Sequence, residues 1–413
     1  MITRQEFPYL QELLINDAYA VKNLRVPVFE PGQEFKHLVL TGRNGSGKTT
    51  VLKSVAAKIQ LDISSSEKHP YQVRNLKSWI GSTTDSSRIE EYSQQLKELT
   101  ATETRFKSAH VSSGENFFPT TKNVLIAYFP ASRNATIAAV TSPTVEDKYI
   151  TALAKPEGVA DFAGQFKQYL VNKKVSQALA QIEGKSGKAT EQNQFFKQLE
   201  QHLGRLFADD ELRLEFVSEN YEFFLHLKDG RKLTFNQLSA GFSAFLSILM
   251  DLLMRVDLLR KQANDYTLDP CGFVLIDEPE THLHLEMQYQ ILPLLTDLFP
   301  NLQFIVATHS PAVASSIKNA TVFDLSTGQV LGDEAAGSSF SELMQTHFGL
   351  ENEYSNVADK ILAEVVEIGQ MTDRAAALAR LRQLLEQQGR YMSPVLRLDV
   401  QAHLLHLQRE QAA

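Results

Sequence analysis

A glycine-rich segment in the N-terminal part of the chain has the residue types that bind a polyphosphate. The pattern G-x-x-x-x-G-K-[ST] occurs in the segment Thr41-Gly42-Arg43-Asn44-Gly45-Ser46-Gly47-Lys48-Thr49-Thr50. Glycines allow backbone conformations in which successive N–H groups point toward one anion. We expect Lys48 to reach the β- and γ-phosphates of a nucleotide and the hydroxyl of Thr49 to bind Mg²⁺. The predicted nucleotide contacts are Gly42, Arg43, Asn44, Gly45, Ser46, Gly47, Lys48, Thr49 and Thr50.

Two adjacent carboxylates form the second reactive group. Asp277 and Glu278 directly follow the apolar segment Phe273-Val274-Leu275-Ile276, which predicts a buried parallel strand. The carboxyl ends of such strands are where an open α/β sheet presents its ligand site. We therefore expect Asp277 to hold Mg²⁺, directly or through water, and Glu278 to accept a proton from an attacking water. The alternative is a chance acidic pair after a strand.

A histidine follows another predicted core strand. The apolar segment 302–307 ends at Thr308-His309-Ser310-Pro311. At the same edge of the sheet as the carboxylates, His309 could contact the γ-phosphate and sense whether it is present. A lone histidine is more often structural, and that interpretation is the alternative.

The elements around these residues predict an α/β fold. A short apolar strand, 37–40, leads into the glycine-rich loop, and a helix over 51–58 follows it. This order of strand, loop and helix distinguishes a phosphate site from a coincidental glycine turn. A further strand over 124–129 ends at Pro130, and Arg133 follows where a loop would point back at the nucleotide.

Alternating apolar residues predict a small antiparallel sheet in the second half of the chain. The alternation runs from Leu212 to Leu227, and Asp229-Gly230 then turns the chain back. This meander delivers the chain to Leu238-Ser239-Ala240-Gly241 and to an apolar helix over 244–259.

The residues between 61 and 207 predict a largely helical insertion. Residues 61–120 are polar and predict irregular structure, with a helical composition over Ser87–His110 but no heptad pattern for a long coiled coil. Residues 145–207 predict helices. We expect helix stops at Gly158 and Gly164 and a mobile surface loop at 184–188.

Lysines give the helical part of the insertion a mild basic bias. We interpret them as a solvated helical face, and a nucleic-acid patch is the alternative. These lysines are Lys167, Lys173, Lys174, Lys185 and Lys188.

The length of 413 residues exceeds what one simple core usually serves. We divide the chain into 1–60, 61–207, 208–330 and 331–413. The last region predicts helices over Phe340–Phe348, Val357–Gly369, Thr372–Gln388 and Pro394–Gln411.

Composition predicts a cytoplasmic, soluble protein. Apolar residues make up 43% of the chain and charged residues 22%, which is ordinary for a globular protein. The one cysteine, Cys271, excludes an internal disulfide and fits a reducing compartment. The start of the chain lacks a secretory apolar region, and the longest apolar run, 245–254, is too short to span a bilayer. The net charge of −8 argues against a surface coated for non-specific nucleic-acid binding.

The order and spacing of these motifs resemble the ABC-type ATPase superfamily, in its branch of SMC, RecF and OLD-like proteins. Gly42–Thr49 corresponds to Walker A, Leu238–Gly241 to the signature motif, Val274–Glu278 to Walker B with the catalytic glutamate, and His309 to the switch histidine. The motifs anchor roughly residues 20–60 and 210–325. The resemblance implies an α/β ATPase head with a mixed sheet core, a helical insertion and a helical C-terminal region, and with ATP and Mg²⁺ as ligands.

The resemblance also implies a head-to-tail dimer. In that family the signature motif completes a nucleotide site of a partner chain. Ser239 and Gly241 of one chain would then meet the γ-phosphate held by Lys48 of another, so that hydrolysis loosens the dimer. The Q-loop region ends at Arg133, and it has no glutamine at the family's position.

A narrower resemblance rests on the residues after the catalytic pair. Asp277-Glu278-Pro279-Glu280-Thr281-His282-Leu283-His284 is similar to the OLD-like and anti-phage-defence ATPases. No acidic cluster with nuclease-like spacing follows Gln329. The chain therefore resembles the stand-alone ATPase subunits of defence systems of the Septu, PARIS and retron-linked types, which act beside a separate nuclease or toxin.

Three other interpretations remain open. The protein could be a DNA-repair ATPase that clamps DNA ends through residues 61–207. It could instead be a scaffold in which ATP holds an oligomer with little turnover, and Glu278→Gln would separate this scaffold from a hydrolytic switch. A metal site at His282, His284 and Glu286 would need an extended conformation, because alternating residues do not share a helix face.

Overall fold

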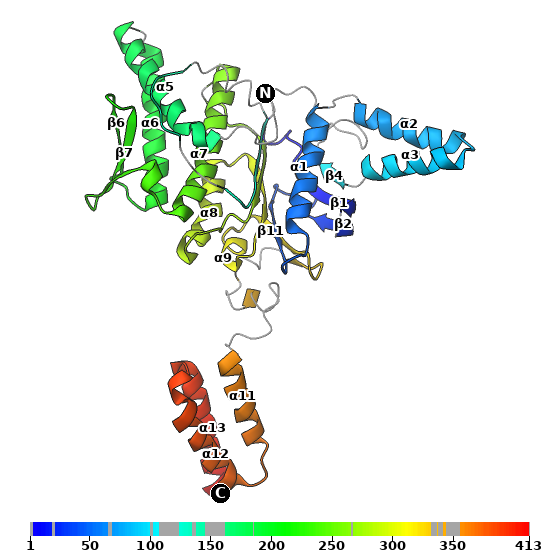
Figure 1. Ribbon diagram of the computed structural model, residues 1–413, viewed down its shortest axis with the longest axis vertical. Helices are drawn as coiled ribbons and strands as arrows, with labels where there is room; N and C mark the ends of the chain where they lie inside the picture. The colour runs from blue at the N-terminus through cyan, green and yellow to red at the C-terminus, as the bar shows by residue number, and fades with distance from the viewer. Residues whose placement is uncertain are drawn as a thin grey trace. The chain divides into compact units, whose positions relative to one another are not determined.

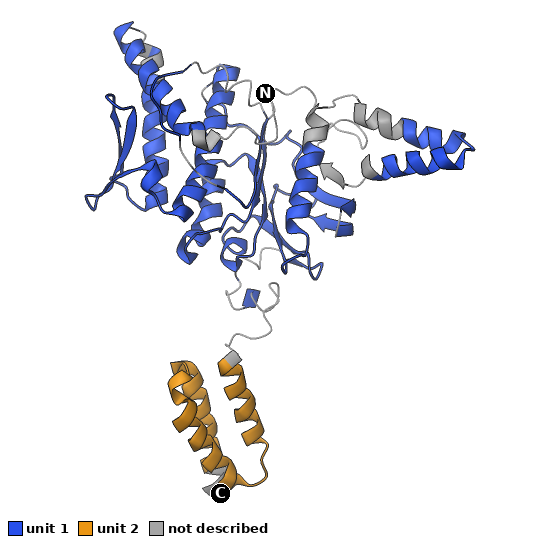
Figure 2. Cartoon of the chain, in the orientation of Figure 1, with its two compact units in different colours: residues 1–343 blue, residues 344–413 orange. Residues whose placement is uncertain are grey.

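The computed structural model describes residues 3–18, 21–64, 68–99, 102–106, 124–133, 138–144, 162–184, 186–265, 267–331, 337, 342–343 and 356–412. The chain forms two compact units, residues 1–343 and residues 344–413 (Figure 2). Among the helices so described, none has the length and apolar character needed to cross a membrane.

A six-stranded mixed sheet forms the centre of the first unit. Its strand order is β12-β11-β3-β10-β9-β5, and all neighbours are parallel except the antiparallel pair β11 and β12. The predicted α/β class with a mixed sheet is therefore confirmed. The strands are β3 (His37–Thr41), β5 (Leu125–Phe129), β9 (Gly272–Asp277), β10 (Leu302–Ala307), β11 (Ala320–Asp324) and β12 (Val330–Leu331).

The sequence forms this sheet because its central strands are continuous apolar runs. Every residue of β3, β9, β10 and β11 is buried. Such runs are typical of parallel strands, because helices cover both of their faces. In Figure 1, α1 (Lys48–Ser64) lies on one side of the sheet, and α7 (Ala240–Ala263) and α8 (Leu285–Leu298) lie on the other. The short helix α9 (Pro311–Ala314) follows β10.

A second sheet extends the core beside α1. It has the antiparallel order β2-β1-β4, and its strands are β1 (Leu10–Ala18), β2 (Val21–Pro27) and β4 (Thr102–Phe106). Leu13 and Val26 of this sheet share one apolar cluster with Leu38 and Phe273 of the central sheet.

The segment before β4 differs from the sequence prediction. Two helices, α2 (Lys68–Ser82) and α3 (Ser86–Leu99), form a hairpin. Irregular structure was predicted over α2, whereas α3 lies where a helical composition was noted. The helix predicted to continue to His110 instead ends at Leu99, and the prediction is wrong for Thr102–Phe106. That strand is short and polar, and it forms because the edge of β1 offers unpaired backbone groups.

A helical pair completes the insertion, and a β-meander follows it in the chain. Helices α5 (Phe162–Ile182) and α6 (Ser186–Phe207) precede the antiparallel strands, as predicted. The strands are β6 (Arg213–Val217), β7 (Glu222–His226) and β8 (Lys232–Thr234).

One predicted helix stop is wrong and another falls where a shorter turn separates α5 from α6. Gly164 lies inside the first turn of α5, where a glycine costs the helix only about 1 kcal/mol. In place of a long loop at 184–188, a turn at Gly184 with φ of 69° lets α6 begin at Ser186. The other predicted stop, Gly158, lies outside the described residues.

Two of the insertion's lysines are buried, so the solvated-face interpretation is wrong for them. Lys173 of α5 lies 2.7 Å from Oδ2 of Asp257 on α7, and Lys167 lies 2.7 Å from Oε2 of Glu222 on β7. Their partners are remote in sequence, so the charge pattern of the helix alone could not predict the pairing. These two lysines do not form a nucleic-acid patch either.

The second unit is a three-helix arrangement. It contains α11 (Asn356–Gly369), α12 (Arg374–Gln388) and α13 (Pro394–Ala412), which confirms three of the predicted C-terminal helices. Ile361, Leu381 and Leu396 are among the residues of its own apolar core. Most of the fourth predicted helix, Phe340–Phe348, lies outside the described residues.

Candidate active site

The glycine-rich loop connects β3 to α1 in conformations that need glycine. Gly42, Gly45 and Gly47 have φ of 132°, 81° and 99°. A Cβ at Gly47 would lie 2.4 Å from Cγ2 of Val21, so a larger residue would displace the β1–β2 hairpin. Arg43, Asn44 and Gly45 at the tip of the loop are exposed, whereas Gly42 and Lys48 at its base are buried.

The loop is closed by its own lysine. Lys48 is buried, and its Nζ donates hydrogen bonds to the carbonyl oxygens of Gly42 at 2.8 Å and Arg43 at 3.2 Å. Burial lowers the pKa of Lys48, and the negative charge of Glu278 is the largest effect opposing this shift. A phosphate group in the loop would satisfy this cation better than neutral carbonyl oxygens do.

The end of β11 braces the loop from outside. The backbone N–H of Arg43 donates to Oγ of Ser326 at 2.7 Å, and the Ser326 N–H donates to Oδ1 of the buried Asp324. The hydroxyl of Ser46 is buried without a hydrogen-bond partner among the described residues, so a polar ligand would satisfy it. No sequence motif pointed to Ser326, because its contact with the loop depends on the pairing of β11 with β3.

The strand β9 brings a carboxylate to the start of α1. The hydroxyl of Thr49 donates a hydrogen bond of 2.8 Å to Oδ2 of Asp277. Burial raises the pKa of Asp277, and the hydrogen bond from Thr49 opposes this shift. A hydroxyl and a carboxylate oxygen are hard oxygen ligands of the kind that Mg²⁺ prefers, so these two residues fit a magnesium site.

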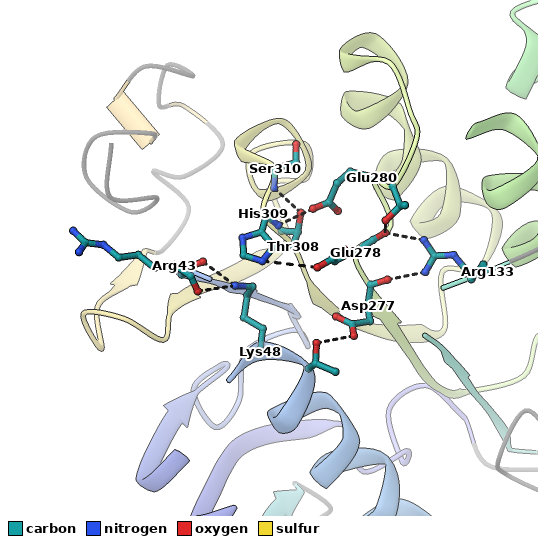
Figure 3. A network of polar contacts seen from close by, with 12 residues as sticks. Arg43, Lys48, Arg133, Asp277, Glu278, Glu280, Thr308, His309 and Ser310 are labelled. Carbon is teal, nitrogen blue, oxygen red and sulfur yellow. Dashed lines mark hydrogen bonds and ion pairs between the residues drawn. The ribbon is translucent and has the colours of Figure 1, made fainter. Parts of the chain in front are cut away.

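Glu278 and His309 lie at the carboxyl ends of neighbouring strands. Nε2 of His309 lies 3.8 Å from Oε1 of Glu278, and their side chains are 35% and 39% exposed (Figure 3). Burial lowers the pKa of His309, with Lys48 as the second cause. A neutral imidazole and an accessible carboxylate therefore face the same space as the lysine of the loop.

Glu280 and Arg133 also converge on this edge, and the sequence motifs assigned neither of them a defined contact. Oε1 of Glu280 accepts a hydrogen bond of 2.6 Å from the backbone N–H of His309. Arg133 donates from Nη1 to the carbonyl oxygen of Asp277 and from Nη2 to that of Glu278, each at 2.7 Å. The position of Arg133 just after a strand that ends at proline was the available signal.

The signature segment lies at the start of α7, whereas the hydrogen bonds of Lys48 are to carbonyl oxygens of its own loop. Ser239 caps α7, and its hydroxyl accepts from the N–H of Phe242 at 3.4 Å. A Cβ at Gly241 would lie 2.2 Å from the carbonyl oxygen of His282, so α7 begins directly against the segment that follows Glu280. Thr50, the remaining predicted contact, lies half-buried in the first turn of α1.

A glycine-rich loop between β3 and α1, joined to a carboxylate strand in a parallel-rich sheet, is the architecture of P-loop ATPases. Residues 168–315 match the family model described as "AAA domain, putative AbiEii toxin, Type IV TA system".

Individual proteins with similar sequences include retron ATPases and a Septu protein. The retron Ec83 probable ATPase of Escherichia coli is 40% identical over 102 residues, which cover 25% of this chain and 19% of that protein. The retron Vc95 probable ATPase of Vibrio cholerae serotype O1 biovar El Tor is 23% identical over 353 residues, covering 69% of this chain and 68% of that protein. Septu protein PtuA of Bacillus thuringiensis is 24% identical over 311 residues, covering 73% and 72%. The predicted resemblance to retron-linked and Septu-type proteins is confirmed.

Among solved structures, a SMC head bound to the C-terminal winged-helix domain of ScpA matches with a TM-score of 0.38 and 12% identity, covering 80% of this chain and 99% of that one. The recombination mediator protein RecF matches with a TM-score of 0.32 and 14% identity, covering 79% and 99%.

Proposed function

We propose that the protein is a Mg²⁺-dependent ATPase that acts as the switch subunit of a bacterial anti-phage defence system and controls a separate nuclease or toxin. The observation that carries the ATPase proposal is the hydrogen bond between Thr49 and Asp277, which joins the phosphate loop to the carboxylate strand. The similarity to retron ATPases and to Septu protein PtuA supports the defence role. We expect the protein to act in the cytoplasm.

In this proposal the loop residues bind and orient ATP. Backbone N–H groups of the glycine-rich loop and the ammonium of Lys48 would hold the β- and γ-phosphates at the N-terminus of α1. Thr49 and Asp277 would hold Mg²⁺, which when bound would offset the charge that develops on the transferred phosphoryl group.

Glu278 is the proposed general base. Its carboxylate is accessible and faces His309, so it could orient and deprotonate a water beside the bound γ-phosphate. The neutral imidazole of His309 can donate a hydrogen bond to the γ-phosphate and report its loss. ADP and phosphate would be the products, with the proton of the water passing to Glu278.

The proposed switch is a head-to-tail dimer around ATP. Ser239 and Gly241 at the start of α7 would contact the γ-phosphate bound by Lys48 of a second copy. Gly241 packs against His282, which follows the catalytic residues closely in the chain. A change at the catalytic residues on hydrolysis could therefore shift the start of α7, which would contact the partner. The dimer would then loosen when the γ-phosphate leaves.

Light scattering on Glu278→Gln protein tests this function. We expect the mass to double on addition of ATP and Mg²⁺, and Lys48→Ala to abolish the change. The wild-type protein should hydrolyse ATP and return to monomer as ATP is consumed. A mass that ATP does not change, with equal function of wild type and Glu278→Gln, would instead favour a preassembled scaffold that captures the effector.

A DNA-end-binding ATPase is the second candidate, but the insertion gives it little support. Lys167 and Lys173 are buried in ion pairs, so they are not available for phosphate contacts. Fluorescence anisotropy with a labelled DNA duplex, with and without ATP, separates the two candidates. ATP-dependent binding at physiological salt would favour the repair role.

A further inference from the structure

Arg133 meets the catalytic turn through backbone atoms. Its guanidinium donates to three carbonyl oxygens, those of Pro130 at 2.8 Å and of Asp277 and Glu278 at 2.7 Å. Figure 3 shows the side chain approaching this turn from the side opposite Lys48. The hydrogen bonds of Arg133 are thus not made to the phosphate loop. They are made to the backbone of the two residues whose carboxylates face that loop.

The sheet itself explains why a side chain is needed at this point. The parallel pairing of β5 with β9 ends at Phe129 opposite Ile276. The next residue, Pro130, has no N–H and cannot continue the ladder. The guanidinium supplies donors to the carbonyl groups of Asp277 and Glu278, beyond the point where the backbone of β5 stops pairing.

The turn that Arg133 holds is strained. Glu278 has φ of 48°, in the left-handed region that residues with a Cβ rarely adopt. Its N–H donates to the carbonyl oxygen of Ala307 at 2.8 Å, and its own carbonyl oxygen accepts from Arg133 and from the hydroxyl of Thr281. The direction of the Glu278 side chain depends on these bonds, because a different φ would rotate the carboxylate away from His309.

We propose that Arg133 is a positioning residue for the proposed ATPase reaction: its planar guanidinium holds the left-handed turn at Glu278 and thereby fixes the base over the phosphate loop. This inference rests on the proposed function. Arginine suits the role because one rigid fork reaches several carbonyl groups, whereas a lysine ammonium does not match this geometry.

A described segment further along the chain from Arg133 contacts the insertion. This segment comprises residues 138–144. The N–H of Thr144 donates to Oδ1 of Asn172 on α5 at 2.9 Å. Gln168, one turn earlier on α5, donates to the carbonyl oxygen of Ser142 at 2.9 Å. Residues 142 and 144 are therefore held on α5.

The test compares turnover with nucleotide affinity in Arg133→Ala and Arg133→Lys. We expect kcat to fall about 100-fold in Arg133→Ala, as a displacement of about 1 Å at a catalytic group can cause. The Kd for a fluorescent ATP analogue should stay within about threefold, because Arg133 does not contact the phosphate loop. Arg133→Lys should lose about tenfold in kcat, and methylguanidinium at millimolar concentration should restore part of the activity of Arg133→Ala.

Arg205→Ala is the matched control, because Arg205 is an exposed arginine paired with Asp297 on the surface. It should leave kcat unchanged. An Arg133→Ala protein with wild-type kcat, or one whose kcat and affinity fall together without rescue by methylguanidinium, would overturn the inference. Wild-type protein and Glu278→Gln are measured alongside. If wild type does not hydrolyse ATP, both the proposed function and the inference fail. If wild type hydrolyses ATP and Arg133→Ala does so equally well, only the inference fails.

Discussion

The hydroxyl of Thr49 and the carboxylate of Asp277 are 228 positions apart in the chain and 2.8 Å apart in the structure. Thr49 lies in the first turn of α1, and Asp277 is the last residue of β9. The contact exists because β3 and β9 both neighbour β10 in parallel orientation, so their carboxyl ends reach the same edge of the sheet. A metal ion bound there would have two oxygen ligands already oriented.

The first prediction concerns this pair. Thr49→Ala removes the hydroxyl, and we expect the Mg²⁺ concentration for half-maximal ATPase activity to rise at least tenfold. Thr49→Ser keeps the hydroxyl and should stay within about threefold of wild type. Titration of Mg²⁺ at saturating ATP measures both values. Equal Mg²⁺ requirements in the alanine and serine variants would remove Thr49 from the proposed metal site.

The second prediction concerns Glu280. Glu280→Ala leaves the backbone N–H of His309 without its acceptor, so the free energy of unfolding should fall by about 1–3 kcal/mol. The ATPase rate should fall about tenfold, because the segment that carries His309 loses its anchor. Glu280→Gln retains an acceptor oxygen, so its stability and its ATPase rate should lie between those of wild type and Glu280→Ala. Glu286→Ala, at an exposed position on α8, is the control and should change either quantity little.

The strands and residues of the candidate site were predictable where the signal was local. The apolar runs before Gly42, Asp277 and Thr308 predict buried strands, and parallel strands bring their carboxyl ends together whatever the loops between them. That rule brings the carboxyl ends of β3 and β9 to one edge, and their order on either side of β10 then places Thr49 beside Asp277.

The contacts of Arg133 and Lys173 were not predictable, because each depends on a remote partner. Arg133 bonds to carbonyl groups 144 and 145 residues away, and nothing in a side-chain pattern reports a backbone acceptor. Lys173 belongs to a group of lysines whose pattern is typical of a solvated helix face. It is buried beside Asp257 only because α5 packs on α7. The strand Thr102–Phe106 likewise forms because β1 offers it an edge.

The third prediction concerns pH. His37 on β3 is buried, burial lowers its pKa to about 4, and its Nδ1 accepts a hydrogen bond of 3.1 Å from the N–H of Phe304. The unfolded chain takes up the proton near pH 6.5, before the folded one does. The contribution of His37 to stability is therefore complete above pH 6.5 and is lost progressively as the pH falls to about 4, by about 3 kcal/mol.

Urea unfolding of wild type and His37→Gln at pH 7.5 and pH 4.5 measures this effect. Other titrating groups are common to both proteins, so the difference between the two free energies isolates His37. We expect wild type to lose most of its advantage at the lower pH. A difference that is the same at both values would contradict the assignment of a neutral, buried His37.

The last prediction concerns the ion pair that joins α5 to α7. Nζ of Lys173 lies 2.7 Å from Oδ2 of Asp257, the hydroxyl of Tyr169 donates to the same carboxylate oxygen, and all three side chains are buried. Removal of one charge leaves the other buried without compensation, so Lys173→Met or Asp257→Asn should each lower the free energy of unfolding by about 3–5 kcal/mol.

A double-mutant cycle separates this pair from ordinary surface charge. We expect the double variant to lose much less than the sum of the single losses, because it buries no unpaired charge. The exposed pair of Arg205 and Asp297, at 2.6 Å, is the control and should show a coupling below about 1 kcal/mol. Similar couplings for the two pairs would mean that apolar contacts hold α5 on α7. Breaking the ion pair between Lys173 and Asp257 would then cost little stability.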